Sequence, residues 1–145
     1  MSEIYLIGVN HMYQLGLVHL EPPAVFAEFR QFMIETIAAN GIRGIAQEMS
    51  WSALEKWSKP ESIPCGLASE LGLPHRYCDR EPHEPDPQRE QIWIDELRSF
   101  DIFPVLFILG ADHVDSFEDL LIKSGFEPFI VARAWKASSA QNGAV

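Results

Sequence analysis

Two histidines stand at the same position in two matching motifs of this chain. The motifs have the form Gly-x-x-His, at residues 8–11 and 110–113, and each directly follows an apolar, strand-like run. Histidine titrates near neutral pH and is the commonest metal ligand in proteins. We expect each glycine to let the chain turn sharply out of a sheet. Because the carboxyl ends of parallel strands face the crevice in which α/β proteins bind ligands, the repeated spacing predicts one shared site containing His11 and His113.

A carboxylate is predicted to face the same crevice. Glu48 ends a second strand-like run, Ile-Ala-Gln-Glu at residues 45–48. A carboxylate in that position can bind a metal or orient a histidine. The alternative is a solvated strand-end residue, or a partner for a helix that begins near Ser50 or Ser52.

A guanidinium is the fourth candidate. Arg89 shares one helical face with three apolar residues that follow it at positions i+4, i+8 and i+11, namely Trp93, Leu97 and Phe100. This face is the buried one, so Arg89 in the first turn should lean toward the carboxyl edge of the sheet. The positive end of the helix dipole disfavours a cation there, which requires an acidic partner or an anionic ligand. The alternative is a surface arginine paired with an acid: Glu48, Asp79 or Glu90.

Strands and helices are predicted to alternate along the chain. Predicted strands span 3–9, 42–47, 75–78, 104–109 and 128–132. Predicted helices span 24–39, 88–100 and 114–123, with two short helical pieces between residues 48 and 72. The long connection from Asn10 to Pro23 is predicted to be a functional loop or lid. Residues 1–135 are predicted to form one α/β domain, and residues 136–145 a disordered tail.

This alternation predicts a three-layer αβα fold with a mostly parallel five-stranded sheet and right-handed crossovers. The natural strand order is 3-2-1-4-5, which makes strands one and four neighbours at the point where clefts open. The alternative flavodoxin-like order, 2-1-3-4-5, separates these two strands and weakens the case for a shared site.

Composition excludes several classes of protein. The chain has 145 residues, a formal net charge of −10 and a pI near 4.8, which disfavours binding to a phosphate backbone. No apolar run reaches the roughly 20 residues of a membrane helix, and residues 1–3 do not resemble the start of a signal peptide. Cys65 and Cys78 are interpreted as reduced packing residues. We therefore expect a soluble cytoplasmic protein without nucleic-acid or membrane partners, and a homodimer stays an open alternative.

The candidate residues allow two kinds of chemistry. His11, Glu48 and His113 could hold a divalent ion such as Mn, Co, Zn or Fe, with an open position for a water molecule whose pKa then falls toward neutrality. Arg89 would stabilise a developing oxyanion or bind an acidic group. Without a metal, either histidine could act as a general base tuned by Glu48. The sequence lacks the motifs of serine hydrolases, phosphate-binding loops and dinucleotide-binding proteins.

The order of these motifs resembles that of the TraB/Tiki superfamily, which also takes in erythromycin-esterase-like and ChaN-like haem-uptake proteins. The matching residues are Gly8–His11, Glu48, Arg89–Trp93 and Gly110–His113, and the resemblance covers roughly residues 4–113. It implies a hydrolase-like site that uses both histidines, the glutamate and the arginine. Tiki-type members are metal-dependent proteases, the erythromycin-esterase branch works without a metal, and the haem-uptake branch binds its ligand. Glu90 departs from the aspartate that is commoner after this arginine.

The sequence therefore predicts a metal-assisted hydrolase that acts on a small-molecule or peptide substrate. A non-catalytic module that binds a metal, or a haem-like or nucleotide-like ligand, is the first alternative. A structural role in a larger assembly is the second, with tryptophans such as Trp51, Trp57 and Trp135 at an interface. The three other histidines, His19, His75 and His83, are interpreted as surface or packing residues.

Overall fold

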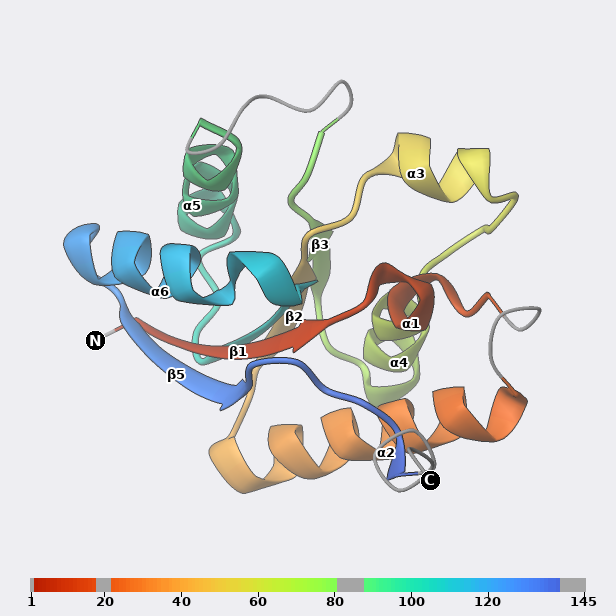
Figure 1. The fold of residues 1–145 in the computed structure, drawn as a ribbon. Coiled ribbons are helices and arrows are strands. Elements are labelled where there is room, and N and C mark those ends of the chain that lie inside the picture. The colour runs from red at the N-terminus through yellow and green to blue at the C-terminus, as the bar shows by residue number, and fades with distance from the viewer. Residues whose placement is uncertain (1, 18–21, 81–87, 139–145) are drawn as a thin grey trace.

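Five parallel strands form one sheet at the centre of the protein (Figure 1). They are β1 (Glu3–Val9), β2 (Gly44–Gln47), β3 (His75–Tyr77), β4 (Val105–Gly110) and β5 (Glu127–Ala132). All the neighbouring pairs are parallel. The structure is a computed structural model, and it describes residues 2–17, 22–80 and 88–138. The predicted fold class, a parallel α/β sheet flanked by helices, is confirmed.

The strand order is β3-β2-β4-β1-β5. The predicted neighbourhood of strands one and four is confirmed, since Ile4 pairs with Val105 and Val9 with Gly110. In contrast to the predicted order 3-2-1-4-5, however, β4 takes the central position and β1 lies beside it. β4 is buried along its whole length, as expected for a strand covered on both faces, whereas β1 keeps two half-buried positions at its start. The carboxyl ends of β1 and β2 therefore flank that of β4.

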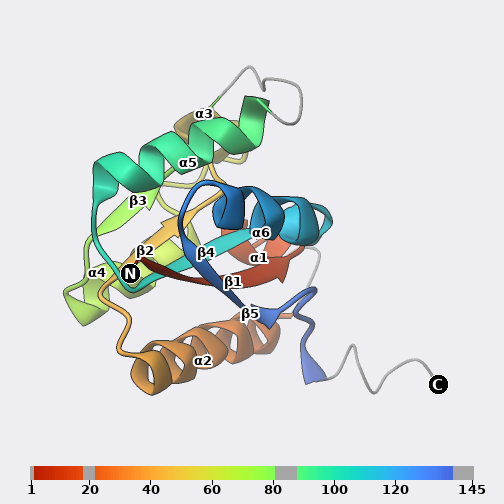
Figure 2. The same ribbon diagram turned by 90° about the vertical axis from the view of Figure 1, so that its left-hand side faces the viewer.

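Helices cover both faces of the sheet (Figure 2). α2 (Pro23–Asn40), α3 (Trp51–Lys56) and α4 (Ile63–Leu71) follow β1 and β2, whereas α5 (Gln88–Phe100), the short helix η1 (Ala111–His113) and α6 (Val114–Lys123) flank β4 in sequence. One apolar core includes Phe29, Met33 and Leu67 from α2 and α4, and a second includes Trp93, Leu97 and Phe117 from α5 and α6. Because the connections leaving β1 and β4 run to opposite faces, a crevice opens between their carboxyl ends. None of the described helices is long and apolar enough to cross a membrane.

The connection predicted as a loop from Asn10 to Pro23 begins with a helix, α1 (His11–Leu15). The Asn10 side chain caps this helix by accepting a hydrogen bond from the Met12 N–H, and Gly16 ends it in the left-handed conformation. His11 is therefore the first residue of a helix and not part of a loop. A helix of five residues is too short to show a helical repeat in the sequence, which is why the capping residues were its only signal.

The domain extends beyond its predicted end at residue 135. Ala137, which falls in the predicted tail, is fully buried in the same apolar core as Phe29 and Met33 of α2, and the Ser138 N–H donates to Glu28 at 2.7 Å. The remainder of the predicted tail, residues 139–145, lies outside the described part of the chain.

The two motif glycines are required for close packing and not for a turn. Gly8 and Gly110 both lie inside strands, and neither has a positive φ. A Cβ atom on Gly8 would overlap the Arg133 carbonyl oxygen and would lie 2.6 Å from Cγ2 of Val114. The Gly8 carbonyl also accepts from the Trp135 N–H at 2.7 Å. Gly8 thus lets the segment after β5 pass directly over the end of β1.

This packing predicts that Gly8→Ala destabilises the protein by about 1–3 kcal/mol, because backbone atoms must move to admit the methyl group. Urea unfolding followed by circular dichroism measures the change. Gly66→Ala is the matched control, since Gly66 lies inside α4 and a Cβ there meets only the Glu61 side chain, at 3.0 Å or more. Alanine favours a helix, so this variant should keep or gain stability. A Gly8→Ala protein as stable as wild type would contradict this account of the motif.

Candidate functional site

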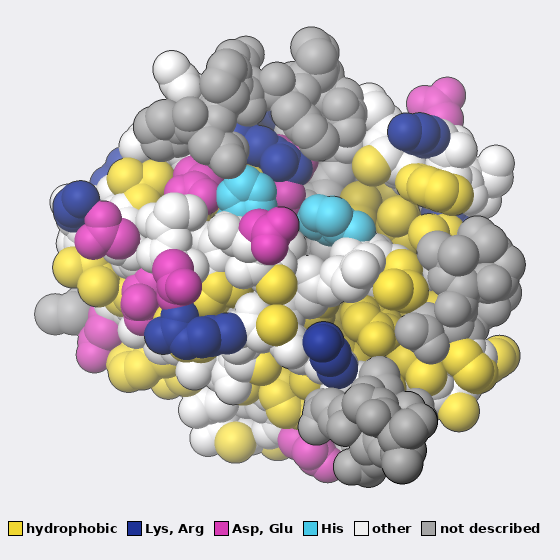
Figure 3. Space-filling view, in the orientation of Figure 1, with side chains coloured by type: hydrophobic (Ala, Val, Ile, Leu, Met, Phe, Trp, Pro, Cys, Tyr) yellow, Lys and Arg dark blue, Asp and Glu magenta, His cyan; other side chains and the backbone are white. Residues whose placement is uncertain are grey.

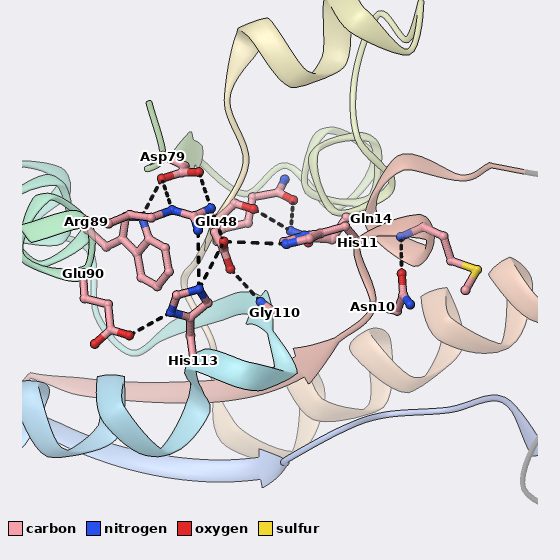
Figure 4. Close-up of polar contacts among 12 residues, drawn as sticks. Asn10, His11, Gln14, Glu48, Asp79, Arg89, Glu90, Gly110 and His113 are labelled. Atoms are coloured by element: carbon pink, nitrogen blue, oxygen red, sulfur yellow. Dashed lines mark hydrogen bonds and ion pairs between the residues drawn. The ribbon is translucent and has the colours of Figure 1, made fainter. Parts of the chain in front are cut away.

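All four predicted site residues meet at the carboxyl edge of the sheet, around the carboxylate of Glu48 (Figure 4). Oε1 of Glu48 accepts from the Gly110 N–H at 2.7 Å, and Oε2 accepts from Nη2 of Arg89. The Nε2 atoms of His11 and His113 lie 3.6 Å and 3.9 Å from Oε2. Residues from α1, α5, η1 and the end of β4 thus converge on one carboxylate, which directly follows β2, and the motifs predict that the four candidate residues meet at this edge.

Glu48 is only 1% exposed, so its charge must be compensated inside the protein. The hydrogen bonds from Gly110 and Arg89 provide this compensation. A Cβ atom on Gly110 would lie 3.2 Å from Oε1 of Glu48 and 3.3 Å from Nε2 of His11. The second motif glycine therefore makes room for the carboxylate and the imidazole at the end of β4.

Arg89 is held between two carboxylates. Its Nε and Nη2 donate to the Asp79 carboxylate at 3.1 Å and 2.8 Å, while Nη2 also bonds Glu48. Asp79 in turn accepts from the indole N–H of Trp93 at 2.9 Å. The alternative of an arginine paired with acids therefore holds for Glu48 and Asp79, but not for Glu90. Since two carboxylates offset its charge, Arg89 is not reserved for an anionic ligand.

His113 is held by a buried acid on its other side. Its Nδ1 lies 2.8 Å from Oε2 of Glu90, which also accepts from the Ser116 hydroxyl at 2.6 Å. A carboxylate only accepts, so Nδ1 carries a hydrogen. Nε2 is then turned toward the site, 3.5 Å from Nη1 of Arg89. Glu90 therefore fixes the tautomer and the orientation of the ring, as the aspartate does for the histidine of serine proteases.

His11 is oriented by a buried amide. Its Nδ1 lies 2.7 Å from Oε1 of Gln14. The Gln14 amide nitrogen donates to Oε1 of Gln47 at 2.9 Å and to the backbone carbonyl of Glu48 at 3.2 Å. Because a backbone carbonyl can only accept, the Gln14 amide has one orientation, and His11 must donate from Nδ1. The His11 side chain is 47% exposed, so its Nε2 stands at the mouth of the site and faces Glu48.

The same network continues to His75 on β3. The Gln47 amide nitrogen lies 2.7 Å from Nε2 of His75 and also donates to the Ser62 hydroxyl. Burial lowers the pKa of His75 to about 4, so the ring is neutral and accepts from Gln47. The interpretation of His75 as a packing residue fits this position, whereas His19 and His83 lie outside the described residues.

Gln14, and the contact of Glu90 with His113, were not identified from the sequence, whereas Asp79 was considered only as an alternative partner of Arg89. Glu90 shares a helical face with Ile94 and Leu97, at i+4 and i+7, and this burial signal could have identified it. Asp79 follows the end of β3, as Glu48 follows β2. Gln14 gave no signal, because the helix that carries it was predicted as a loop. Asp112, in the second motif, is exposed, and the residue that precedes α6 is His113, whose side chain makes no capping hydrogen bond.

The site opens to the surface through a cleft of about 700 Å³. Residues from the ends of β1 and β4 line it, together with the segment after β5 that contains Trp135. The space-filling view shows two histidine side chains close together at the centre of this face, with acidic side chains around them (Figure 3). A ligand of moderate size can therefore reach both imidazoles from solvent.

The predicted divalent ion requires the two Nε2 atoms and Oε2 of Glu48 as ligands. Both nitrogens are turned toward that oxygen, yet Arg89 bonds the same oxygen and faces Nε2 of His113. An ion in this position would have to displace a guanidinium, and a positive charge next to a metal is unfavourable. In the described part of the chain, no group of three His, Cys, Asp or Glu residues has the arrangement of a metal site. With Arg89 bound to Glu48 in this way, the three side chains do not fit a bound divalent ion. The metal therefore remains a prediction from the sequence.

Comparison of the chain with protein families, with curated proteins and with solved structures finds no match.

The burial of His75 predicts an acid-sensitive contribution to stability. Its pKa in the folded protein, about 4, lies below the usual 6.5, so the unfolded chain binds more protons between these values. The stabilisation is complete above pH 6.5 and is lost progressively as the pH falls toward 4. We expect His75→Gln to make the unfolding free energy less dependent on pH between 7 and 4.5. Urea unfolding at several pH values tests this, and an unchanged pH dependence would contradict the proposed burial of a neutral ring.

Proposed function

We propose that this protein is a hydrolase that cleaves an ester or amide bond by general acid–base catalysis at the edge of the sheet. The observation that carries the proposal is the Glu90–His113 pair: Nε2 of His113 lies beside the Arg89 guanidinium, on an open cleft that His11 also lines. The resemblance to the TraB/Tiki superfamily agrees with this class of reaction. A small molecule or a short peptide is the proposed substrate, and the cytoplasm is the proposed compartment, consistent with two free cysteines.

In the proposed reaction His113 is the general base. Its Nε2 takes a proton from a water molecule while the water oxygen adds to the carbonyl carbon of the substrate. Glu90, 2.8 Å from Nδ1, stabilises the imidazolium that forms. Arg89, next to this nitrogen, stabilises the negative charge that develops on the carbonyl oxygen.

His11 is the proposed general acid. In its protonated form the Nε2–H faces Oε2 of Glu48, at an Nε2–Oε2 distance of 3.6 Å. When the tetrahedral intermediate collapses, the bond to the leaving oxygen or nitrogen breaks and this atom takes the proton from His11. Glu48 thus contacts both the acid and the arginine, which makes it the residue on which the geometry depends.

The proposal predicts that Glu48→Gln lowers kcat by about 10²-fold or more, because the acid and the oxyanion-stabilising group both lose their partner. Hydrolysis of p-nitrophenyl acetate is measured against the uncatalysed rate, once with EDTA and once with added Mn, Co, Zn or Fe. Glu35→Gln, an exposed position on α2, is the matched control and should keep full activity.

Three outcomes of this experiment are informative. Activity in EDTA that Glu48→Gln abolishes supports the metal-free reaction. If activity requires one added ion in near-stoichiometric amount, the metal-assisted reaction predicted from the sequence is supported. The assignment of His11 as acid and His113 as base would then be overturned. Equal activity in wild type, Glu48→Gln and a His11→Ala/His113→Ala variant would overturn the hydrolase proposal.

A binding module without turnover is the second candidate. It is favoured by the pairing inside the site: no buried side-chain nitrogen or oxygen of the described residues lacks a hydrogen-bond partner. Such a site is satisfied before a ligand arrives and suits an uncharged ligand in the cleft. Folded protein that binds ligands but shows no turnover in any arm of the assay would select this candidate.

A further inference from the structure

The site lies between two cavities. The cleft of about 700 Å³ is one, and a second cavity of about 420 Å³ lies beside α3. Among the described residues, three line both of them: His11, Glu48 and Arg89. The proposed general acid His11, together with Glu48 and Arg89, therefore forms the wall at which the two cavities meet, whereas the proposed base His113 lines the cleft.

The α3 cavity has an apolar floor. Leu15 and Met49 line it and are buried, and they belong with Leu17 and Leu54 to a small apolar cluster separate from the two main cores. Ala53 also lines the cavity, and the indole of Trp57, 43% exposed, borders it. The cavity therefore offers apolar surface next to the reacting groups.

The polar groups of the α3 cavity include the exposed side chain of Lys56 as well as groups of the site itself. The Ser50 hydroxyl already caps α3 by accepting from the Ala53 N–H at 3.1 Å. Where the cavity reaches the site, its wall contains the carboxylates of Glu48 and Asp79, whose charges Arg89 offsets. Because these charges already offset one another, an uncharged apolar group can lie against this wall and the apolar floor without leaving a charge unpaired.

The larger cleft has a different character. Its rim contains Asn10, Asp112 and Lys136, while Tyr13 and Trp135 form an edge-to-face aromatic pair at its inner wall, with ring centroids 5.1 Å apart. A polar group with several hydrogen-bonding atoms suits this rim. The two cavities therefore differ both in size and in chemistry.

We infer that the substrate has two unequal arms on either side of the hydrolysed bond. A short alkyl chain or a single aromatic ring occupies the α3 cavity, and a larger polar group occupies the cleft. A volume of about 420 Å³ lies in the range of small-molecule pockets, roughly 300–1,000 Å³. This assignment of the substrate class rests on the proposed hydrolase function.

Two alanines allow a matched test, because each lines only one cavity. Ala53→Phe fills the α3 cavity, and Ala134→Phe fills part of the cleft. The substrates are glycerol monohexanoate and glycerol monoacetate, which share a polar arm and differ only in the apolar one. We expect Ala53→Phe to lower the ratio of kcat/KM for hexanoate over acetate about tenfold, and Ala134→Phe to leave the ratio unchanged. An unchanged ratio in Ala53→Phe would overturn the assignment.

Binding of 1-hexanol tests the cavity without turnover. In ¹H–¹⁵N NMR spectra of the wild type, we expect hexanol to shift the amides of Met49 and Ala53 and the indole N–H of Trp57. Ala53→Phe should abolish these shifts, and Ala134→Phe should preserve them. If Ala53→Phe does not fold, Ala53→Leu replaces it.

The NMR result separates the two proposals. If hexanol binds at these residues but no ester is hydrolysed, the hydrolase proposal is overturned, and the α3 cavity remains a binding site for an apolar group. If hexanol causes no shifts in the wild type, or if the shifts persist in Ala53→Phe, the α3 cavity does not bind the apolar group. This conclusion would hold even if hydrolysis is observed.

Discussion

The burial of one carboxylate, that of Glu48, is the constraint on which the rest of the site depends. A carboxylate 1% exposed is stable only with partners that compensate its charge, and removal of such a partner typically costs about 3–5 kcal/mol. The partners come from elements far apart in sequence: the N–H of Gly110 at the end of β4, and Arg89 at the start of α5. Arg89 then requires Asp79 at the end of β3. These hydrogen bonds and ion pairs therefore connect the ends of β2, β3 and β4 with the start of α5.

The same arrangement divides the roles of the two imidazoles. α5 supplies Arg89 and Glu90 at successive positions, and one bonds Glu48 while the other bonds His113. His11 is instead backed by the neutral Gln14 amide and stands nearer to solvent. An acid behind one ring and an amide behind the other make the two histidines chemically different. This difference supports a base and an acid rather than two equivalent metal ligands.

Much of this site could be predicted because strand ends are visible in sequence. Apolar runs that end in Glu48 or in the Gly-x-x-His motifs place side chains at one edge of any parallel sheet. The exact strand order was less accessible, since it depends on which apolar strand is covered on both faces. The role of the glycines was also hidden, because it comes from the neighbours of Gly8 and Gly110 in space. The contact of Glu90 with His113 depends on where η1 lies in the fold, and no local sequence pattern specifies that position.

A double-mutant cycle between Glu48 and Arg89 tests the central claim most directly. The unfolding free energies of the wild type, Glu48→Gln, Arg89→Gln and the double variant are measured in urea at pH 7. We predict that the double variant is more stable than the sum of the single effects implies, with a coupling of about 1–3 kcal/mol, because each single change leaves a buried charge without its partner. Additive effects, within about 0.5 kcal/mol, would contradict the dependence of the site on this ion pair.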